Sequence, residues 1–445
     1  MIRLISRLWH SSTQRVMTLG GVGMALALLA DVLIARRLGF TATTDALLIA
    51  LMLPRLIGTV GRDATKFSLM TVFIQVQKED GEEALRDLGA RVLNLFLTIG
   101  LVLTCAGLLL AGPIVSVIGW GLDPADRELS AMLLRLLAGI ATFALGSAVL
   151  EVMLNSHKHF TVTAIRNAVA PCVVIATTLV TRRNPDAPYW IAGAFTAGYG
   201  LYFLLLTVHA GRRLGFIPNP RRWPGRLTFN KLRGTIGYPL AGFGVRQSAR
   251  VVERMITSLG PDGSVAAYYY AYRLLAAIQN LVGVSVALTG QPKLTEHDLA
   301  GEEGRFIAAL RRRIGVILLI SIPAAAVLML MSRPIIGLLY GRGGLGREGL
   351  SASASVLFVL GPAAVFYCLT PVLNSALYAQ RRYGAVLYNM CFAAGSNVLL
   401  AFVLFKWLGL TGVAWAASAA AVLSVLNLLW LLTRPTRPPT NTLTP

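Results

Sequence analysis

Residues 92–111 read VLNLFLTIGLVLTCAGLLLA, and this run contains no charged side chain. A helix needs about 20 apolar residues to cross the hydrocarbon core of a bilayer, so the run is long enough to span a membrane. Similar runs recur along the whole 445-residue chain, in which 55% of the residues are hydrophobic and 14% are charged. Soluble domains carry about 25% charged residues, so the composition predicts a polytopic membrane protein.

Twelve stretches are long and apolar enough to be membrane-spanning helices. They cover residues 16–36, 44–74, 92–111, 128–154, 162–181, 188–209, 233–258, 264–290, 313–332, 350–378, 383–405 and 410–432. The stretch 44–74 is the least regular, because it holds Pro54, Gly58 and Gly61 beside several charges, and we expect a break in it. The first stretch is too long for the apolar part of a signal peptide, so we expect it to be kept as a helix.

The basic residues predict the orientation in the membrane. The net charge is +21, from 41 Lys and Arg against 20 Asp and Glu. Most of these cations lie between apolar stretches, which favours a topological explanation over nucleic-acid binding. Alternate loops are richer in Lys and Arg, most of all residues 211–233, and the richer set is expected on the cytoplasmic side. Both termini are then cytoplasmic.

Weak internal similarity indicates that the chain is built from two halves. The matching pairs are Leu154-Asn155-Ser156 with Leu373-Asn374-Ser375, Gly112-Pro113-Ile114 with Arg333-Pro334-Ile335, and 46–61 with 268–283. All three pairs are separated by nearly the same distance, close to half the chain. Because each half would hold six spans, both keep the same orientation, which predicts a parallel repeat around a central cavity. We expect a lobe at 1–210, a basic linker at 211–232, a second lobe at 233–433 and a disordered tail at 434–445.

Several ionisable side chains lie inside the predicted spans, where each is costly and is a functional candidate by default. They are Asp31, Asp45, Arg55, Arg62, Asp63, Lys66, Arg135, Glu151, Arg246, Arg250, Glu253, Arg254 and Arg273. Arg135 and Arg254 lie near span ends, and the alternative to a functional role is that their side chains extend to the membrane surface. Asp31 and Glu151 are expected to be structural partners near the membrane edges.

Arg246, Arg250 and Arg254 follow each other at intervals of four residues, which places them in one stripe on a helix. Such a stripe cannot face lipid, so it must face water or an anionic ligand. The planar guanidinium fork suits phosphate, because it donates two parallel hydrogen bonds. Glu253 can offset part of the repulsion, and a purely structural pair of Arg250 with Glu253 is the alternative.

The sequence shows no catalytic or nucleotide-binding signature. It contains no Walker A motif, its predicted outer loops are short, and Cys105, Cys172, Cys368 and Cys391 form no CxxC pair. We therefore expect no enzymatic activity, no cofactor and no metal site.

Two segments resemble a known family. The first is Asp31-Val-Leu-Ile-Ala-Arg-Arg-Leu-Gly39 with Thr44-Asp45-Ala46 and Leu53-Pro54, and the second is Gly244-Val-Arg-Gln-Ser248 with Tyr269-Tyr-Ala-Tyr-Arg-Leu274. In order and spacing they resemble MurJ/MviN-type lipid II flippases of the multidrug/oligosaccharidyl-lipid/polysaccharide exporter superfamily. Ala30, Gly58 and Tyr272 stand where that family has charged residues.

The resemblance implies two six-helix lobes in a V around a cationic cavity, and outward transport of an undecaprenyl-pyrophosphate-linked glycan by alternating access. The glycan is lipid II or a capsule, O-antigen or exopolysaccharide unit, and the transport is driven by the membrane potential, a monovalent cation or a proton. We expect Arg246, Arg250, Arg273, Arg55 and Arg62 to bind substrate, and Asp45 and Glu253 to form gating ion pairs.

Three other functions remain open. A drug or cation antiporter of the same superfamily would need an acidic cavity, whereas arginines outnumber carboxylates inside the predicted spans. A membrane glycosyltransferase would need catalytic carboxylates and a larger outer loop. A scaffold would recruit partners through its basic cytoplasmic loops without transport.

Overall fold

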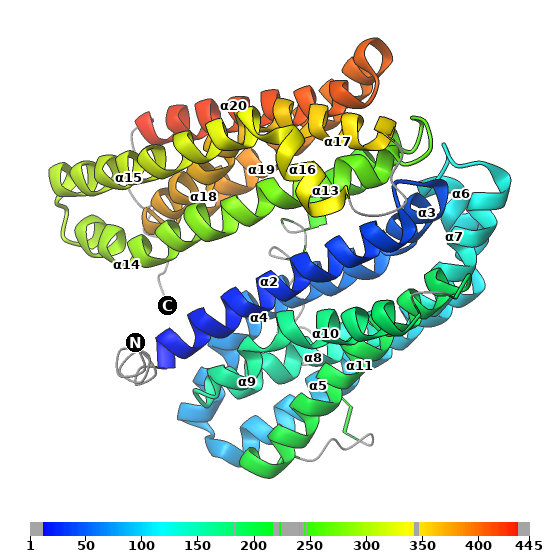
Figure 1. Cartoon of the computed structure of the whole chain (residues 1–445). Coiled ribbons are helices and arrows are strands. Elements are labelled where there is room, and N and C mark those ends of the chain that lie inside the picture. The colour runs from blue at the N-terminus through cyan, green and yellow to red at the C-terminus, as the bar shows by residue number, and fades with distance from the viewer. Residues whose placement is uncertain are drawn as a thin grey trace, which may run out of the picture. The chain divides into compact units, whose positions relative to one another are not determined.

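The structure is a computed structural model, and it describes residues 12–181, 184–216, 222–223, 240, 242, 244–245, 247–341 and 347–434. Every regular element in these ranges is a helix (Figure 1). A helix satisfies its own backbone hydrogen bonds, which a hydrocarbon environment requires. The all-α polytopic architecture expected from hydropathy is confirmed.

The first half of the chain forms a series of helices joined by short turns. They are α2 (Ser12–Leu38), α3 (Ala42–Ala50), α4 (Met52–Glu79), α5 (Gly81–Leu109), α6 (Ala111–Ile118), α7 (Pro124–Leu137), α8 (Ile140–Ser156), α9 (Phe160–Ala164), α10 (Arg166–Val180) and α11 (Ala187–Leu214). Gly215 ends α11 with a φ of 60°, the left-handed conformation that glycine adopts without strain. The helix therefore extends into the start of the predicted linker.

The second half continues in the same way. Its elements are α13 (Ser264–Ile278), the π-helix η1 (Gln279–Val284), α14 (Ser285–Leu299), α15 (Glu303–Leu330), α16 (Ser332–Tyr340), α17 (Arg347–Leu360), α18 (Ala363–Ala379), α19 (Tyr383–Leu408) and α20 (Leu410–Thr433). Residues 247–257 are also helical. The predicted tail from residue 435 on lies outside the described residues.

Within the described ranges, nine helices are long and apolar enough to cross a membrane, and a tenth span follows if the bent pair 348–360 and 363–379 is one. Arg166–Val180 is a shorter apolar helix at the position of the fifth predicted span. Most of the seventh predicted span, 233–258, is outside the described residues except for its helical end. The other predicted spans coincide with these helices.

Two breaks in the helices follow from proline. The predicted irregularity of 44–74 is a junction at Leu51, between α3 and α4. Pro54 lacks an N–H and its ring crowds the carbonyl four residues earlier, which interrupts the helical ladder there. Gly361 and Pro362 separate α17 from α18, and the two helices meet at a bend of 49°.

The described residues fall into two compact units. The first contains the chain up to Tyr270 together with Ile336–Leu350, and the second contains Ala271–Ile335 and the chain from Ser351 on. The division lies inside α13, because residues 247–270 pack with the first half. The lobe boundary at 211–232 stays a prediction.

In the predicted linker, Arg222 contacts α5. Its guanidinium donates a hydrogen bond to Asp87 at 2.6 Å, and its carbonyl oxygen accepts one from Asn94 at 2.6 Å. These bonds attach this part of the linker to α5.

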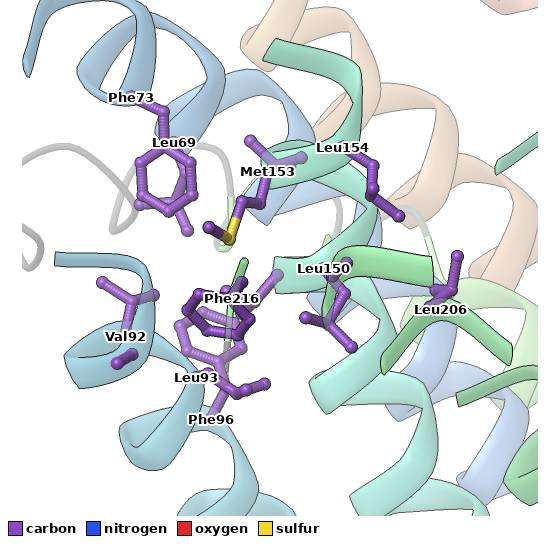
Figure 2. Packing of buried hydrophobic residues seen from close by; sticks show 14 of the residues in the cluster. Leu69, Phe73, Val92, Leu93, Phe96, Leu150, Met153, Leu154, Leu206 and Phe216 are labelled. Carbon is purple, nitrogen blue, oxygen red and sulfur yellow. The ribbon is translucent and has the colours of Figure 1, made fainter. Parts of the chain in front are cut away.

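The core of the first unit is a cluster of apolar side chains from four helices (Figure 2). Its labelled members are Leu69 and Phe73 of α4, Val92, Leu93 and Phe96 of α5, Leu150, Met153 and Leu154 of α8, Leu206 of α11, and Phe216. α5, α8 and α11 lie side by side around it (Figure 1). Phe216 reaches this core because the left-handed Gly215 turns the chain back after α11.

Some helices approach each other closely at glycines. Alanine substitutions at two glycines of α11 are expected to have opposite effects on stability. A Cβ at Gly198 would lie 2.6 Å from the Cα of Ala170 in α10, whereas a Cβ at Gly193 meets nothing within 4 Å. We predict that Gly198→Ala destabilises the fold by about 1–3 kcal/mol through overpacking. Gly193→Ala should be neutral or stabilise by up to about 1 kcal/mol through helix propensity. Thermal unfolding of the purified variants checks this, and equal melting temperatures for the two would contradict the packing.

Candidate functional site

One face of α4 carries a row of cations. Arg55, Arg62 and Lys66 are separated by seven and four residues, which at 3.6 residues per turn places them on the same side of the helix. Arg55 and Arg62 are partly buried and Lys66 is exposed. The neighbouring face packs against α8, since a Cβ at Gly58 would lie 3.0 Å from the Cβ of Ala144. Position 58, where the resembled family has a charge, is therefore part of a helix contact.

Arg55 contacts side chains of two other helices and is connected to a third through Tyr269. Its Nη1 donates a hydrogen bond to the Tyr269 hydroxyl oxygen of α13 at 2.8 Å, and its Cζ lies 4.9 Å from the ring centroid of Phe195 in α11. The Tyr269 hydroxyl donates to Oδ1 of Asp31 in α2 at 3.4 Å. Tyr269 thus connects a cation to a buried carboxylate, which compensates the charge of Arg55 inside the spans.

Arg254 approaches the same tyrosine from the helical residues 247–257. Its Cζ lies 5.0 Å from the ring centroid of Tyr269, and the Cζ of Arg55 lies 6.0 Å from that centroid. The guanidinium of Arg254 therefore lies over the same aromatic ring as that of Arg55. Arg55, Arg254, Tyr269 and Asp31 together are called the Tyr269 cluster below.

Arg62 belongs to a separate polar group in the same unit. It donates to Oδ1 of the adjacent Asp63 at 3.3 Å. Nearby, the buried Glu151 of α8 accepts from the Tyr202 hydroxyl at 3.0 Å and lies 3.9 Å from Nη1 of Arg166. The described contacts therefore bring Arg55, but not Arg62, into the Tyr269 cluster, and they give Glu151 the structural partners expected for it.

Asp45 belongs to α3 and is buried against the first turn of α13. Its Oδ2 accepts hydrogen bonds from the backbone N–H groups of Gly263 at 2.9 Å and Val265 at 3.3 Å, and its Oδ1 accepts from Ala266 at 2.8 Å. The carboxylate satisfies N–H groups that the first turn of a helix leaves unpaired, and it complements the positive end of the helix dipole. These bonds go to backbone amides, and the gating ion pair expected of Asp45 stays a prediction. We call this arrangement the Asp45 clasp.

Residues just before Asp45 make further contacts with distant segments of the first unit. Arg36 donates to the carbonyl oxygens of Leu339 at 2.9 Å and Leu338 at 3.0 Å, at the end of α16. The ring of Phe40 lies 5.5 Å from that of Tyr270 and 6.2 Å from that of Tyr340. Residues 36–45 therefore contact both the start of α13 and the end of α16, and connect these two segments.

Glycine allows Phe40 to fit closely into this arrangement. Gly263 has a φ of 84°, and a Cβ there would lie 2.4 Å from the carbonyl oxygen of Phe40. A Cβ at Gly349 would lie 2.9 Å from the Phe40 side chain. Any larger residue at either position would push Phe40 away.

The other predicted site residues are only partly described. Arg246 lies outside the described residues. Arg250 is exposed on the helical segment 247–257, and Glu253, three residues later, is 4% exposed. Arg273 is partly buried in the part of α13 that belongs to the second unit. Their roles in substrate binding and gating stay predictions.

Sequence reasoning missed the centre of the cluster, Tyr269. The available signal was a group of three tyrosines directly before an arginine inside a predicted span, Tyr269-Tyr-Ala-Tyr-Arg273. Within the described part of the chain, no group of three or more His, Cys, Asp or Glu side chains is placed to hold a metal ion.

Comparisons with known proteins agree with this architecture. The profile of the family described as "Lipid II flippase MurJ" matches residues 34–442. A probable lipid II flippase MurJ of Bdellovibrio bacteriovorus is 27% identical over 388 residues, which cover 84% of this chain and 72% of that protein. One of Thermotoga maritima is 25% identical over 391 residues, covering 87% and 78%.

Solved structures show the same fold. Lipid II flippase MurJ in an inward closed conformation aligns with a TM-score of 0.82 at 21% identity, covering 94% of this chain and 87% of that one. An inward-facing MATE family multidrug resistance transporter of the MOP superfamily aligns with a TM-score of 0.81 at 16% identity, covering 92% and 93%.

The fold and the charged groups inside its spans define a multi-pass membrane protein of the transporter class. Within that class, the family profile covers nearly the whole chain. The chain belongs to the lipid II flippase MurJ family.

The Asp45 clasp predicts a measurable contribution to stability. Asp45→Ala should lower the free energy of unfolding by about 0.5–2 kcal/mol, the usual cost of losing a helix cap, because three buried N–H groups lose their acceptor. Asp45→Asn retains one carbonyl oxygen and should lose less. Thermal unfolding in detergent measures both, with Asp63→Asn as a control because Asp63 is partly exposed and pairs with the adjacent Arg62. A melting temperature for Asp45→Ala equal to that of the unmodified protein would contradict the clasp.

Proposed function

We propose that this chain translocates lipid II, a glycan linked to an undecaprenyl pyrophosphate, from the cytoplasmic to the outer face of the bacterial inner membrane. The Tyr269 cluster carries the proposal, because it places two guanidinium groups beside one ring among apolar helices. Such groups are stable there when they meet water or an anion. Membership of the MurJ family supplies the substrate class.

The chemistry of the substrate fits this arrangement. Its pyrophosphate is the charged part, and guanidinium groups recognise phosphate oxygens through paired hydrogen bonds. Arg55 and Arg62 on one face of α4 would bind this group at successive depths, with Arg246, Arg250 and Arg273 adding charge from the second half of the chain. The polyprenyl tail would stay in lipid during the movement.

The distribution of Lys and Arg among the loops supports one orientation of the protein in the membrane. With both termini cytoplasmic, the loop at 36–41, the loop at 258–263 and the segment at 331–349 all fall on the outer side. The contacts of residues 36–45 support this, because Arg36 meets α16, Phe40 meets Tyr340 and Asp45 meets α13. The Asp45 clasp then lies at the outer end of the transport path.

Alternating access requires this outer end to open. Opening would break the three hydrogen bonds of Asp45 and the two of Arg36, and would withdraw Phe40 from Gly263 and Gly349. We propose that these contacts keep the outer side closed until substrate is bound. Glu253 is proposed to pair with a cavity arginine in the same cycle.

The membrane potential can contribute to the driving force. Moving one net negative charge outward across 100 mV, inside negative, releases about 2.3 kcal/mol. A counter-moving monovalent cation or proton is the other source that we propose.

A drug or cation antiporter of the same superfamily is less compatible with the site. Organic cations need an acidic cavity, whereas Asp31 is the one carboxylate against the two arginines of the Tyr269 cluster. The similarity to the multidrug transporter is one of fold.

Translocation by the purified protein tests the proposal. In proteoliposomes, fluorescent lipid II should become accessible to a membrane-impermeant reagent on the opposite face only when the protein is present. Arg273→Ala should reduce this rate at least about tenfold, because one charge-assisted interaction with phosphate is lost. Arg135→Gln, an exposed arginine on α7, is the matched control. Lipid II movement equal to that of empty liposomes would refute the function, and a normal rate in well-folded Arg273→Ala would refute that residue's role.

A further inference from the structure

The turn between α8 and α9 has a strained backbone. Lys158 has a φ of 63°, in the left-handed region that residues with a side chain rarely adopt. The N–H of Lys158 donates to the carbonyl oxygen of Asn155 at 3.0 Å, and the N–H of His159 donates to that of Leu154 at 2.9 Å. Helices that end in this way usually have glycine at the left-handed position. Contacts outside the turn must therefore help to hold it.

His157, at the end of α8, connects this turn to α5. Its Nδ1 lies 2.9 Å from the carbonyl oxygen of Met153, and its Nε2 lies 2.8 Å from Oε2 of Glu82. The imidazole is 13% exposed. Gln77, near the end of α4, donates to the other oxygen of the same carboxylate at 2.6 Å. Three helix ends thus meet at one carboxylate.

The contact between His157 and Glu82 holds a proton. Both ring nitrogens face oxygen atoms that, in a carbonyl group and an ionised carboxylate, can only accept hydrogen bonds. A neutral imidazole carries a single N–H, so it would turn the lone pair of Nε2 toward the negative carboxylate. The contact therefore needs an imidazolium, or a proton on the carboxyl group. In both cases, closing it takes up one proton.

The other charged and titratable groups near this contact are basic. They are Arg86 on α5, Lys158 and His159 in the turn, and His209 and Arg213 on α11. His159 meets His209 edge to face, with 5.4 Å between the ring centroids. Each of these groups is a cation or becomes one on protonation, so none of them favours an imidazolium at position 157. Glu82 is the carboxylate that does.

We propose that the α8–α9 turn is a pH-sensitive latch. At low pH the shared proton joins His157 to Glu82, and the turn stays closed in its strained conformation. As the pH rises through the range in which histidines titrate, about 5 to 8, the proton leaves, the contact opens and the strain at Lys158 is released. In the proposed orientation this turn is cytoplasmic, so the latch responds to cytoplasmic pH. It does not depend on which lipid is transported.

Hydrogen exchange of the full chain in nanodiscs tests the latch, because both faces of the protein then meet the same buffer. The amides of Lys158 and His159 report on the turn. After correction for the intrinsic effect of pH on exchange, their protection should fall about three- to tenfold between about pH 6 and pH 8. The proton that leaves His157 and Glu82 causes this loss.

A second turn of the same geometry provides an internal control. Arg381, at the end of α18, has a φ of 57°. The N–H groups of Arg381 and Arg382 donate to the carbonyl oxygens of Tyr378 at 3.0 Å and Leu377 at 2.9 Å. The sequence has no histidine between residues 373 and 390. The corrected protection of these amides should therefore be the same at both pH values.

Two variants identify the groups responsible. Glu82→Gln leaves every histidine in place, and its amide can donate to a neutral imidazole, so protection should no longer depend on pH. Lys158→Gly removes the strain, so the turn should stay protected at the higher pH. Because this substitution suits the backbone, it remains a test even if Glu82→Gln does not fold.

Three results would overturn the latch. The first is equal protection of the unmodified turn at both pH values, and the second is an unchanged pH dependence in folded Glu82→Gln. The third is a pH dependence that disappears in His209→Phe but persists in Lys158→Gly, which would assign the effect to the pair of His159 and His209.

Discussion

Charge inside apolar helices is the constraint on which the rest of this structure depends. A cation placed among membrane-spanning helices must find compensation, and the protein provides it for Arg55 through one side chain, Tyr269. That tyrosine comes from the second half of the sequence, whereas Arg55 and Asp31 come from the first. The first compact unit therefore extends to Tyr270, well beyond the first half of the chain. The position of α13 and the chemistry of the site follow from the same contacts.

The ends of helices form a second level of the same electrostatic organisation. Asp45 lies at the positive end of α13, and Arg36 bonds carbonyl oxygens at the negative end of α16. The two side chains are nine residues apart in sequence and have opposite charges, each suited to the helix end that it meets. Phe40 lies between them in sequence and fits against Gly263 and Gly349. One short segment thus joins three parts of the chain, and a transport cycle that opens this end must release all of them together.

Hydropathy and proline positions predicted most of the fold, because both act locally. Apolar runs predicted the spans, and Pro54 predicted the break that the structure places at Leu51. The candidate site was harder, because its geometry depends on neighbours distant in sequence. The charged residues were visible, but the sequence could not show that Gly58 packs on α8, that Arg62 pairs with Asp63, or that Asp45 meets backbone amides. Tyr269 has no charge of its own, so only the folded chain reveals that it connects three ionised groups.

The most direct test of the central claim is the location of lipid II in cells from which the protein is depleted. Inner-membrane vesicles of known orientation, treated with an impermeant reagent, show on which face the lipid accumulates. If this chain is a lipid II flippase, undecaprenyl-linked lipid II should build up on the cytoplasmic face and the cells should lyse. If lipid II keeps its normal distribution and growth continues, the account is contradicted.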